Sequence, residues 1–197
     1  MSSKNISLKE KFKLALTSTA KVISDDFDLN NKNLKNKNSN DVIEIDNLTN
    51  PSDFIKLRAE TDSAALKKKF SNEKIYKKNL PTNNSSRSLY NIAEKIRYES
   101  LGGKMLKGIK KNFNENYSQI INSKRKDQLK AKEDVPVAEA FELYMLKNFH
   151  QIKLNALATK MLNFWEKVFE KSIDKHKNFL QENLENQNKY NSRFTEI

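Results

Sequence analysis

The chain has 197 residues, which is enough for one domain of ordinary size, with or without a flexible arm. Its hydrophobic fraction of 37% is low, and its charged fraction of 31% is high, for a compact enzyme. It has no cysteine, which excludes a disulfide framework, a thiolate metal site and a cysteine nucleophile. We therefore expect a small helical core, with part of the chain exposed to solvent.

The net charge of +12 is concentrated in the middle of the chain. Residues 51–135 carry 20 basic and 10 acidic side chains, whereas the segments on either side are almost balanced. This distribution favours a basic face. Lysine outnumbers arginine by 32 to 5. An A/T-rich coding sequence would produce the same lysine bias without any function, and we favour that explanation over a functional one.

No stretch of about eighteen apolar residues occurs that could span a membrane. The first residues also lack the apolar core of a signal peptide. We therefore expect a cytoplasmic protein with no membrane partner.

The first part of the chain, residues 1–29, is predicted to contain one amphipathic helix over residues 7–24. Ser7 followed by Glu10 has the spacing of a capping box, in which each side chain bonds to the other residue's backbone N–H. The segment 30–41 is rich in asparagine and lysine and cannot bury a core. We expect it to be a flexible low-complexity linker.

Residues 42–184 are predicted to form a helical domain. The alternating stretch 42–46 could be a short β element. Apolar residues recur at helical spacing over residues 51–70, and again from Arg87 towards Leu101. The expected fold class is therefore mainly α, a helical bundle with a flexible N-terminal loop and at most one short β element.

Two further helices are expected in the last third of the chain. Pro136 in a first turn, with Glu139 three residues later, predicts a helix start. A broad apolar stripe over residues 154–184 predicts one long helix. The segment 185–197 is polar, and we expect it to be a tail that frays.

The three glycines fall within seven positions of a stretch that otherwise predicts helix, at Gly102, Gly103 and Gly108. Glycine in a helix costs roughly 1 kcal/mol relative to alanine, so three together need a geometric reason. The apolar residues before and after the pair point about 140° apart around a straight helix. Those after it are Met105, Leu106, Ile109 and Phe113. We expect a bend or restart at Gly102–Gly103, and close packing at Gly102 and Gly108.

No catalytic or metal-binding pattern is found. His150 and His176 are not spaced as a ligand pair, and no glycine-rich phosphate loop is present. Glu60, Asp62 and Glu99 could form an acid–base pair, but charged residues on amphipathic helices more often lie on solvated faces. We expect no catalytic residue, no metal ligand and no cofactor-binding residue in this chain.

Lysines are grouped in two places. One group is Lys104, Lys107 and Lys111, on one side of the helix after the glycines. The other comprises Lys67, Lys68, Lys69, Lys77 and Lys78. Such groups can bind phosphates or an acidic protein surface. Stacking aromatics and arginines are sparse around them, so the first interpretation is a solvated face, the second an acidic partner and the third nucleic acid.

Two segments resemble the N-terminal region of the T subunit of aerobic cobaltochelatase, the CobT family. Residues 57–66, LRAETDSAAL, are similar to that family's L-R-G-E-A-D-x-x-A-L stretch. Residues 96–103, IRYESLGG, continue to Gly108 and Asn112 and resemble its V-R-x-E-A-x-G motif with a later glycine and asparagine. Weaker similarity near the start and before the later helix extends the resemblance over most of the chain.

The resemblance implies a non-catalytic subunit of the ATP-dependent complex that inserts cobalt into the corrin ring in aerobic cobalamin biosynthesis. In that family this subunit pairs with an AAA+ ATPase subunit, and a large subunit holds the tetrapyrrole. ATP with magnesium, and cobalt, would be used by the complex and not bound by this chain. Members continue into an acidic region and a von Willebrand A domain. Neither is expected in these 197 residues, so the chain is either part of a longer protein or a relative without those parts.

The resemblance also points to six candidates for interface or structural contacts: Arg58, Glu60, Arg97, Glu99, Gly102 and Gly108. Arginine offers a planar fork for paired hydrogen bonds, and this chain uses it only five times. The charged candidates could set subunit geometry or tie two helices of this chain together. A basic helical nucleic-acid-binding protein is the alternative function.

Overall fold

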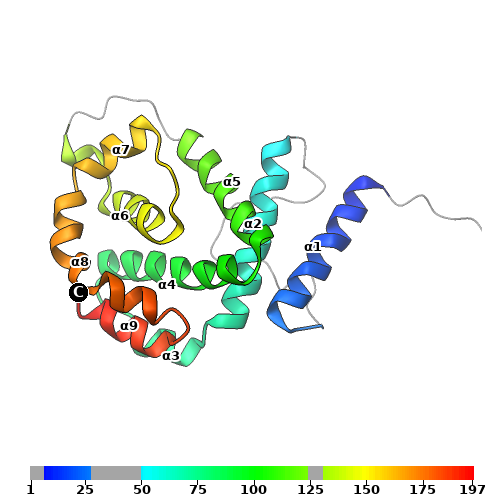
Figure 1. Ribbon diagram of the computed structural model, residues 1–197, viewed down its shortest axis with the longest axis horizontal. Helices are drawn as coiled ribbons and strands as arrows, with labels where there is room; N and C mark the ends of the chain where they lie inside the picture. Colours follow the sequence, from blue (N-terminus) through cyan, green and yellow to red (C-terminus); the bar gives the residue numbers. More distant parts are fainter. Residues whose placement is uncertain (1–6, 28–49, 124–130) are drawn as a thin grey trace, which may run out of the picture. The chain divides into compact units, whose positions relative to one another are not determined.

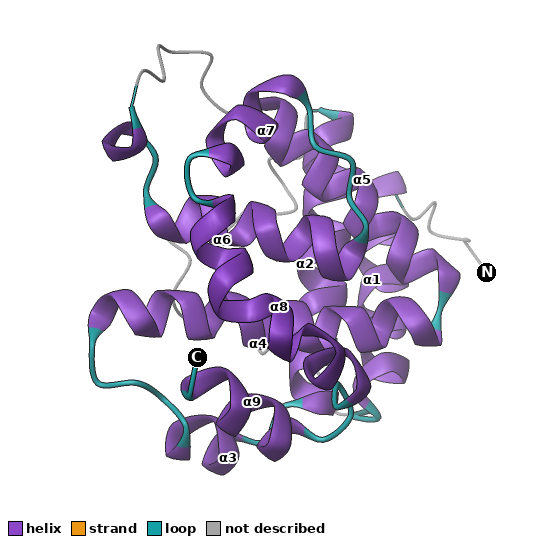
Figure 2. Ribbon diagram, turned by 60° about the vertical axis from the view of Figure 1, so that its left-hand side comes forward, coloured by secondary structure: helices purple, strands orange, loops and turns teal. Residues whose placement is uncertain are grey.

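The computed structural model describes residues 7–27, 50–123 and 131–197, and all the regular structure in these ranges is helical (Figure 1; Figure 2). The expected mainly α fold class is confirmed. The possible strand at residues 42–46 and the expected linker at 30–41 lie outside the described residues. The chain divides into two compact units, Met1–Lys69 and Phe70–Ile197.

The first unit contains α1 (Leu8–Ser24) and α2 (Pro51–Phe70) up to Lys69. The predicted capping box at the start of α1 is confirmed. The backbone N–H of Glu10 donates to Ser7 Oγ at 3.3 Å, and the backbone N–H of Ser7 donates to Glu10 Oε2 at 2.9 Å. Two of the otherwise unpaired N–H groups of the first turn are satisfied in this way.

Contacts near both ends show that α1 and α2 run in the same direction. The rings of Phe12 and Phe54 lie 5.0 Å apart near the beginnings of the two helices. Near their ends, two ion pairs join them: Lys68 with Asp26, and Lys69 with Asp25. The aromatic contact and the ion pairs together fix the register of the pair.

The second unit is built around α4 (Asn84–Met105), which packs against α5, α6, α9 and the π-helical segment η4 (Figure 1). The Asn83 side chain caps α4 by accepting the backbone N–H groups of Ser85 and Ser86 at 2.8 and 3.2 Å. The other helices are α3 (Glu73–Lys78), α5 (Lys107–Ser123), α6 (Val137–Met145), α7 (Ala156–Asn163), α8 (Glu166–Glu182) and α9 (Gln187–Thr195), with the 3₁₀ turn η3 (Lys132–Asp134) and the π-helical η4 (Leu146–His150). The core of the unit contains Tyr90, Ile96, Phe113, Tyr117, Phe141, Leu143, Tyr144 and Tyr190.

The helix does not break at the glycine pair. Helix α4 continues through Gly102 and Gly103, and none of the three glycines has a positive φ. The chain leaves the helix at Leu106, which is extended at φ −138° and ψ 122°, and α5 begins at the next residue. A restart was therefore correctly predicted, but its position was wrong. Because Met105 and Leu106 lie at this break, they are 42% and 46% exposed instead of facing the core.

The glycines differ in their surroundings. Gly102 is buried. Gly108 is exposed, and a Cβ atom there would meet nothing within 4 Å, so the close packing expected at this position is wrong. A Cβ atom on Gly103 would lie 3.6 Å from Lys110 Cβ, an ordinary contact.

The predicted long helix over residues 154–184 is also wrong, because the structure has α7 and α8 there. Trp165, at the junction, has φ −120° and ψ −14°. Its indole N–H donates to the carbonyl of Val135 at 3.1 Å, and Lys132 Nζ lies 3.9 Å from the ring centroid. These contacts hold the tryptophan at the junction, and the two helices share the apolar stripe.

The expected frayed tail over residues 185–197 instead contains α9. Tyr190 is completely buried, and its hydroxyl donates to the carbonyl of Ala93 at 3.2 Å. Asn79, at the end of α3, accepts hydrogen bonds from Ser192 and Thr195 at 3.0 Å each. A polar helix is ordered here because its hydrogen bonds are made to neighbouring elements rather than to water.

We predict that Gly102→Leu lowers the free energy of unfolding by about 1–3 kcal/mol, because the added side chain enters a packed interior. Gly108→Leu is the matched control, since the same side chain enters open space at an exposed helical position. Urea denaturation of both variants measures the difference. Equal stability of the two variants would contradict this account of the glycines.

Candidate functional site

The centre of the second unit is a buried charged side chain, Arg97 of α4. None of it is exposed to solvent. Its Nε and Nη2 atoms donate to the two carboxylate oxygens of Glu94, at 2.8 and 2.9 Å. The same guanidinium donates to the carbonyls of Leu184 at 2.7 Å and Phe70 at 2.6 Å. A buried charge is tolerated only when it is paired and hydrogen-bonded, and here four strong bonds satisfy it.

Glu94 extends this network to α9. Its Oε1 atom also accepts a hydrogen bond from Ser71 Oγ at 2.6 Å and one from Gln187 Nε2 at 3.0 Å. Gln187 Oε1 in turn accepts the backbone N–H of Asn72 at 2.6 Å. The Arg97 network, as we call these residues, therefore joins α4 to the segment that precedes α3 and to the start of α9.

A second buried polar cluster lies further along α4. The hydroxyl of Tyr117, from α5, donates to Glu99 Oε2 at 2.6 Å, and both residues are buried. Burial, and then the charge of Glu99, raise the pKa of Tyr117 well above its ordinary value. The phenol therefore stays protonated and remains a donor to the carboxylate.

His150, the last residue of η4, packs against this cluster. Its ring centroid lies 5.9 Å from that of Tyr117 and 6.1 Å from that of Phe113, both edge-on. Burial lowers the pKa of His150 below its ordinary value, and this effect outweighs the opposing influence of Glu99 and of the Ile96 backbone. His150 Nε2 has no hydrogen-bond partner among the described residues. The imidazole is therefore held neutral in an aromatic setting.

The charged candidates do not pair with each other within each motif. Arg97 bonds to Glu94 instead of Glu99, because residues two apart do not share a helix face whereas residues three apart do. In α2, Arg58 and Glu60 are exposed. The guanidinium carbon of Arg58 lies 5.9 Å from the Phe12 ring centroid, and Glu60 Oε1 lies 3.9 Å from Lys56 Nζ.

The six candidates thus fall into two sets. Arg97, Glu99 and Gly102 are buried in the second unit, whereas Arg58, Glu60 and Gly108 are exposed. The sequence analysis missed Glu94 and Gln187. The spacing of Glu94 and Arg97 is a detectable signal for an intrahelical pair. No local signal connects Gln187 to residues that lie about a hundred positions earlier.

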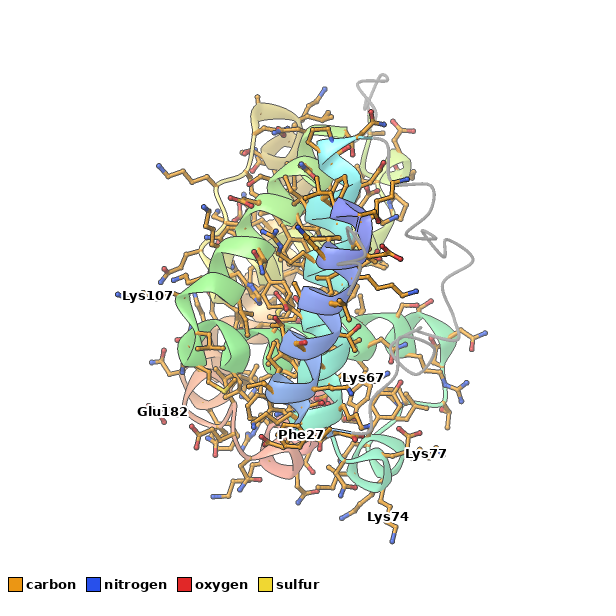
Figure 3. The ribbon with its side chains drawn as sticks, turned by 90° about the vertical axis from the view of Figure 1, so that its right-hand side faces the viewer. Phe27, Lys67, Lys74, Lys77, Lys107 and Glu182 are labelled. Carbon is orange, nitrogen blue, oxygen red and sulfur yellow. The ribbon has the colours of Figure 1, made fainter. Side chains whose placement is uncertain are left out.

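Several lysines of the groups noted in the sequence lie on the surface. Lys77 and Lys111 pair with carboxylates of their own helices, Glu73 at 3.2 Å and Glu115 at 3.6 Å. The side chains of Lys74 and Lys77 extend away from α3 (Figure 3). In the described ranges no group of three or more histidines or carboxylates is placed to hold a metal ion. None of the helices described has the length and hydropathy needed to cross a bilayer.

The fold and these networks define a helical protein whose buried charged groups join its helices. The family described as cobalamin biosynthesis protein CobT matches residues 7–197, and the chain belongs to this family. The resemblance inferred from the two motifs is thereby confirmed. Membership connects the chain with cobalamin biosynthesis and cobaltochelatase. Comparison with curated proteins and with solved structures gives no significant match.

We predict that Arg97→Leu lowers the free energy of unfolding by about 3–5 kcal/mol, because Glu94 is left as an uncompensated buried charge. Arg87→Leu is the control, since Arg87 is an exposed arginine of the same helix. Urea denaturation measures the free energy of unfolding of both variants. The Arg97→Leu/Glu94→Leu double variant shows how much of the loss comes from leaving Glu94 without its partner. A loss at Arg97 no larger than that at Arg87 would show that the network does not hold the unit together.

A pH dependence follows from the lowered pKa of His150. Because the unfolded chain binds a proton at this residue more readily than the folded protein, stability is complete above the ordinary pKa of about 6.5 and falls as the pH drops below it. The slope reaches at most about 1.4 kcal/mol per pH unit. Urea denaturation between pH 7.5 and 5 should show this slope in the wild type, and His176→Gln measures the share of the second histidine, whose pKa is also lowered. The slope should be reduced in His150→Gln; an unchanged slope there would assign the dependence to other groups.

Proposed function

We propose that this chain is a non-catalytic subunit of the ATP-dependent cobaltochelatase complex that inserts cobalt into the corrin ring in aerobic cobalamin biosynthesis. In this proposal it is the assembly partner of an AAA+ ATPase subunit, and a large subunit binds the tetrapyrrole. ATP with magnesium is used by the ATPase, and cobalt is a substrate of the complex. The protein acts in the cytoplasm. The match of the CobT family to residues 7–197 is the observation that carries the proposal.

The chemistry of the buried residues supports a scaffold role. The buried charged side chains Arg97, Glu94 and Glu99 make hydrogen bonds to other residues inside the second unit. Glu94 joins α4 to the distant α9 through Gln187, and Glu99 joins α4 to α5 through Tyr117. A side chain used in this way stabilises a surface for a partner and does not itself contact a substrate.

The two motifs are used differently, which suggests where a partner binds. The motif of α4 is buried through Arg97 and Glu99, whereas the motif of α2 presents Arg58 and Glu60 at the surface. In this proposal the exposed charged pair of α2 contributes to contact with the ATPase subunit. An arginine is suited to that role because its guanidinium forms paired hydrogen bonds with carboxylates.

Co-expression with the AAA+ subunit of the same complex tests the proposal. We expect the two proteins to co-purify, and nuclease treatment should leave the complex intact. Arg58→Ala with Glu60→Ala should weaken co-purification, whereas Arg87→Ala, another exposed arginine, should not. The isolated chain should neither hydrolyse ATP nor bind cobalt. Hydrolysis by the isolated chain, or no association with the ATPase, would contradict the proposal.

The net charge of +12 favours one alternative, a nucleic-acid-binding protein. Binding of that kind weakens steeply as salt rises, with a slope set by the number of phosphate contacts. Measuring retention of an oligonucleotide at two salt concentrations, with and without the ATPase subunit, separates the two functions.

A further inference from the structure

Helix α8 carries two rows of opposite charge. The carboxylates Glu166, Glu170 and Asp174 recur every fourth residue, and a lysine follows each of them directly, at positions 167, 171 and 175. Because consecutive residues of a helix are about 100° apart, the two rows lie on different sides. We call the second row the α8 lysine row: Lys167, Lys171 and Lys175.

Two carboxylates of the acidic row, Glu166 and Asp174, are used within the protein. Glu166 Oε1 lies 2.6 Å from Lys147 Nζ, and Asp174 Oδ1 accepts the hydroxyl of Tyr144 at 2.8 Å. Both partners come from the α6–η4 segment, so these carboxylates hold α8 to the core. No ion pair joins the α8 lysine row to a carboxylate in the described part of the chain, and all three lysines are exposed. The three lysines therefore present their charge at the surface without a direct carboxylate partner, although exposed Glu170 and Asp174 lie on the same helix.

The lysine row lines a surface groove of about 550 Å³. The other lining residues are Val168, Ser172, His176, Glu196 and Ile197. Val168 is 47% exposed, so the groove offers an apolar contact as well as charge. Glu196 carries the one acidic side chain among the lining residues, and it lies 3.7 Å from Arg193 Nε. Positive charge therefore dominates.

His176 reports on this local charge. Its pKa is lowered by partial burial, and then by Lys175 and Arg193, whereas Glu196 acts in the opposite direction. Arg193 is held beside the groove, with its guanidinium carbon 4.7 Å from the Phe179 ring centroid. A negatively charged ligand in the groove would offset the two cations and raise the pKa of His176.

We propose that this groove binds an acidic segment of a partner protein, whose carboxylates match the α8 lysine row and whose apolar side chain covers Val168. The lysines are separated by about 6 Å along the helix axis, which is one step of four residues in an acidic helix laid alongside. The proposal does not depend on the cobaltochelatase assignment.

A protein segment fits the groove better than nucleic acid does. The lining residues include a single ring on which a base could stack, that of His176, and the nearby guanidinium of Arg193 is already engaged by Glu196 and Phe179. Glu196 would repel a continuous phosphate backbone, whereas spaced carboxylates can avoid it. Exposed Val168 contributes nothing to phosphate binding but suits an apolar residue of a peptide.

Binding of a synthetic helical peptide tests the proposal. The probe carries glutamate at every fourth position with one leucine, and a second peptide has glutamine in place of each glutamate. Fluorescence anisotropy with the full chain should show binding of the acidic peptide only. Changing all three lysines of the row to glutamate should weaken binding by about tenfold or more, because three favourable pairs become repulsive.

The control variant changes Lys104, Lys107 and Lys111 to glutamate. It alters the net charge by the same amount in the same unit, so a general charge effect would weaken binding equally in both variants. An equal loss would overturn the proposal. Stronger binding of a single-stranded oligonucleotide of the same charge would also overturn it, in favour of nucleic acid. Self-association lost only in the α8 variant would identify a second copy of this chain as the occupant instead.

Titration of the two histidines by NMR distinguishes binding at the groove from loss of folding. Addition of the acidic peptide should raise the pKa of His176 and leave that of buried His150 unchanged. A peptide that binds without moving His176 would place the binding site elsewhere and refute the proposal.

Discussion

The guanidinium of Arg97 has no water to solvate it, and the arrangement of the second unit follows from that constraint. Each of its three nitrogen atoms must find an acceptor inside the protein. Glu94 supplies two, and the carbonyls of Leu184 and Phe70 supply the others. Because these groups come from separate parts of the sequence, satisfying one side chain fixes the positions of several elements. A planar, permanently charged group suits this role, and a lysine would not replace it.

The Arg97 network also explains why the polar helix α9 is ordered. Its sequence is too polar to be driven into the core by hydrophobicity alone, yet Gln187 and Tyr190 are buried. Gln187 is bonded to Glu94 and Asn72, and Tyr190 to Ala93. The helix is therefore held by hydrogen bonds to α4 and to the segment before α3. Leaving those buried groups unpaired would cost more than the bonds themselves contribute.

Burial divides the family motifs into structural and surface residues. The α4 motif supplies Arg97 and Glu99 to the interior, where they bind Glu94 and Tyr117. The α2 motif keeps Arg58 and Glu60 exposed, and α8 keeps its lysine row exposed while two of its carboxylates bond to the α6–η4 segment. The interior charges thus hold the helices together, whereas the charges of these other residues stay at the surface.

The sequence by itself determined the helical class, the capping box at Ser7 and the family, because these depend on periodicity, on residues three or four apart and on short motifs. It misplaced the break after α4, merged α7 with α8 and missed the order of α9. Those features depend on contacts such as Trp165 with Val135 and Gln187 with Glu94. Only the tertiary structure brings such partners together, because the energy of burying a polar group depends on neighbours distant in the chain.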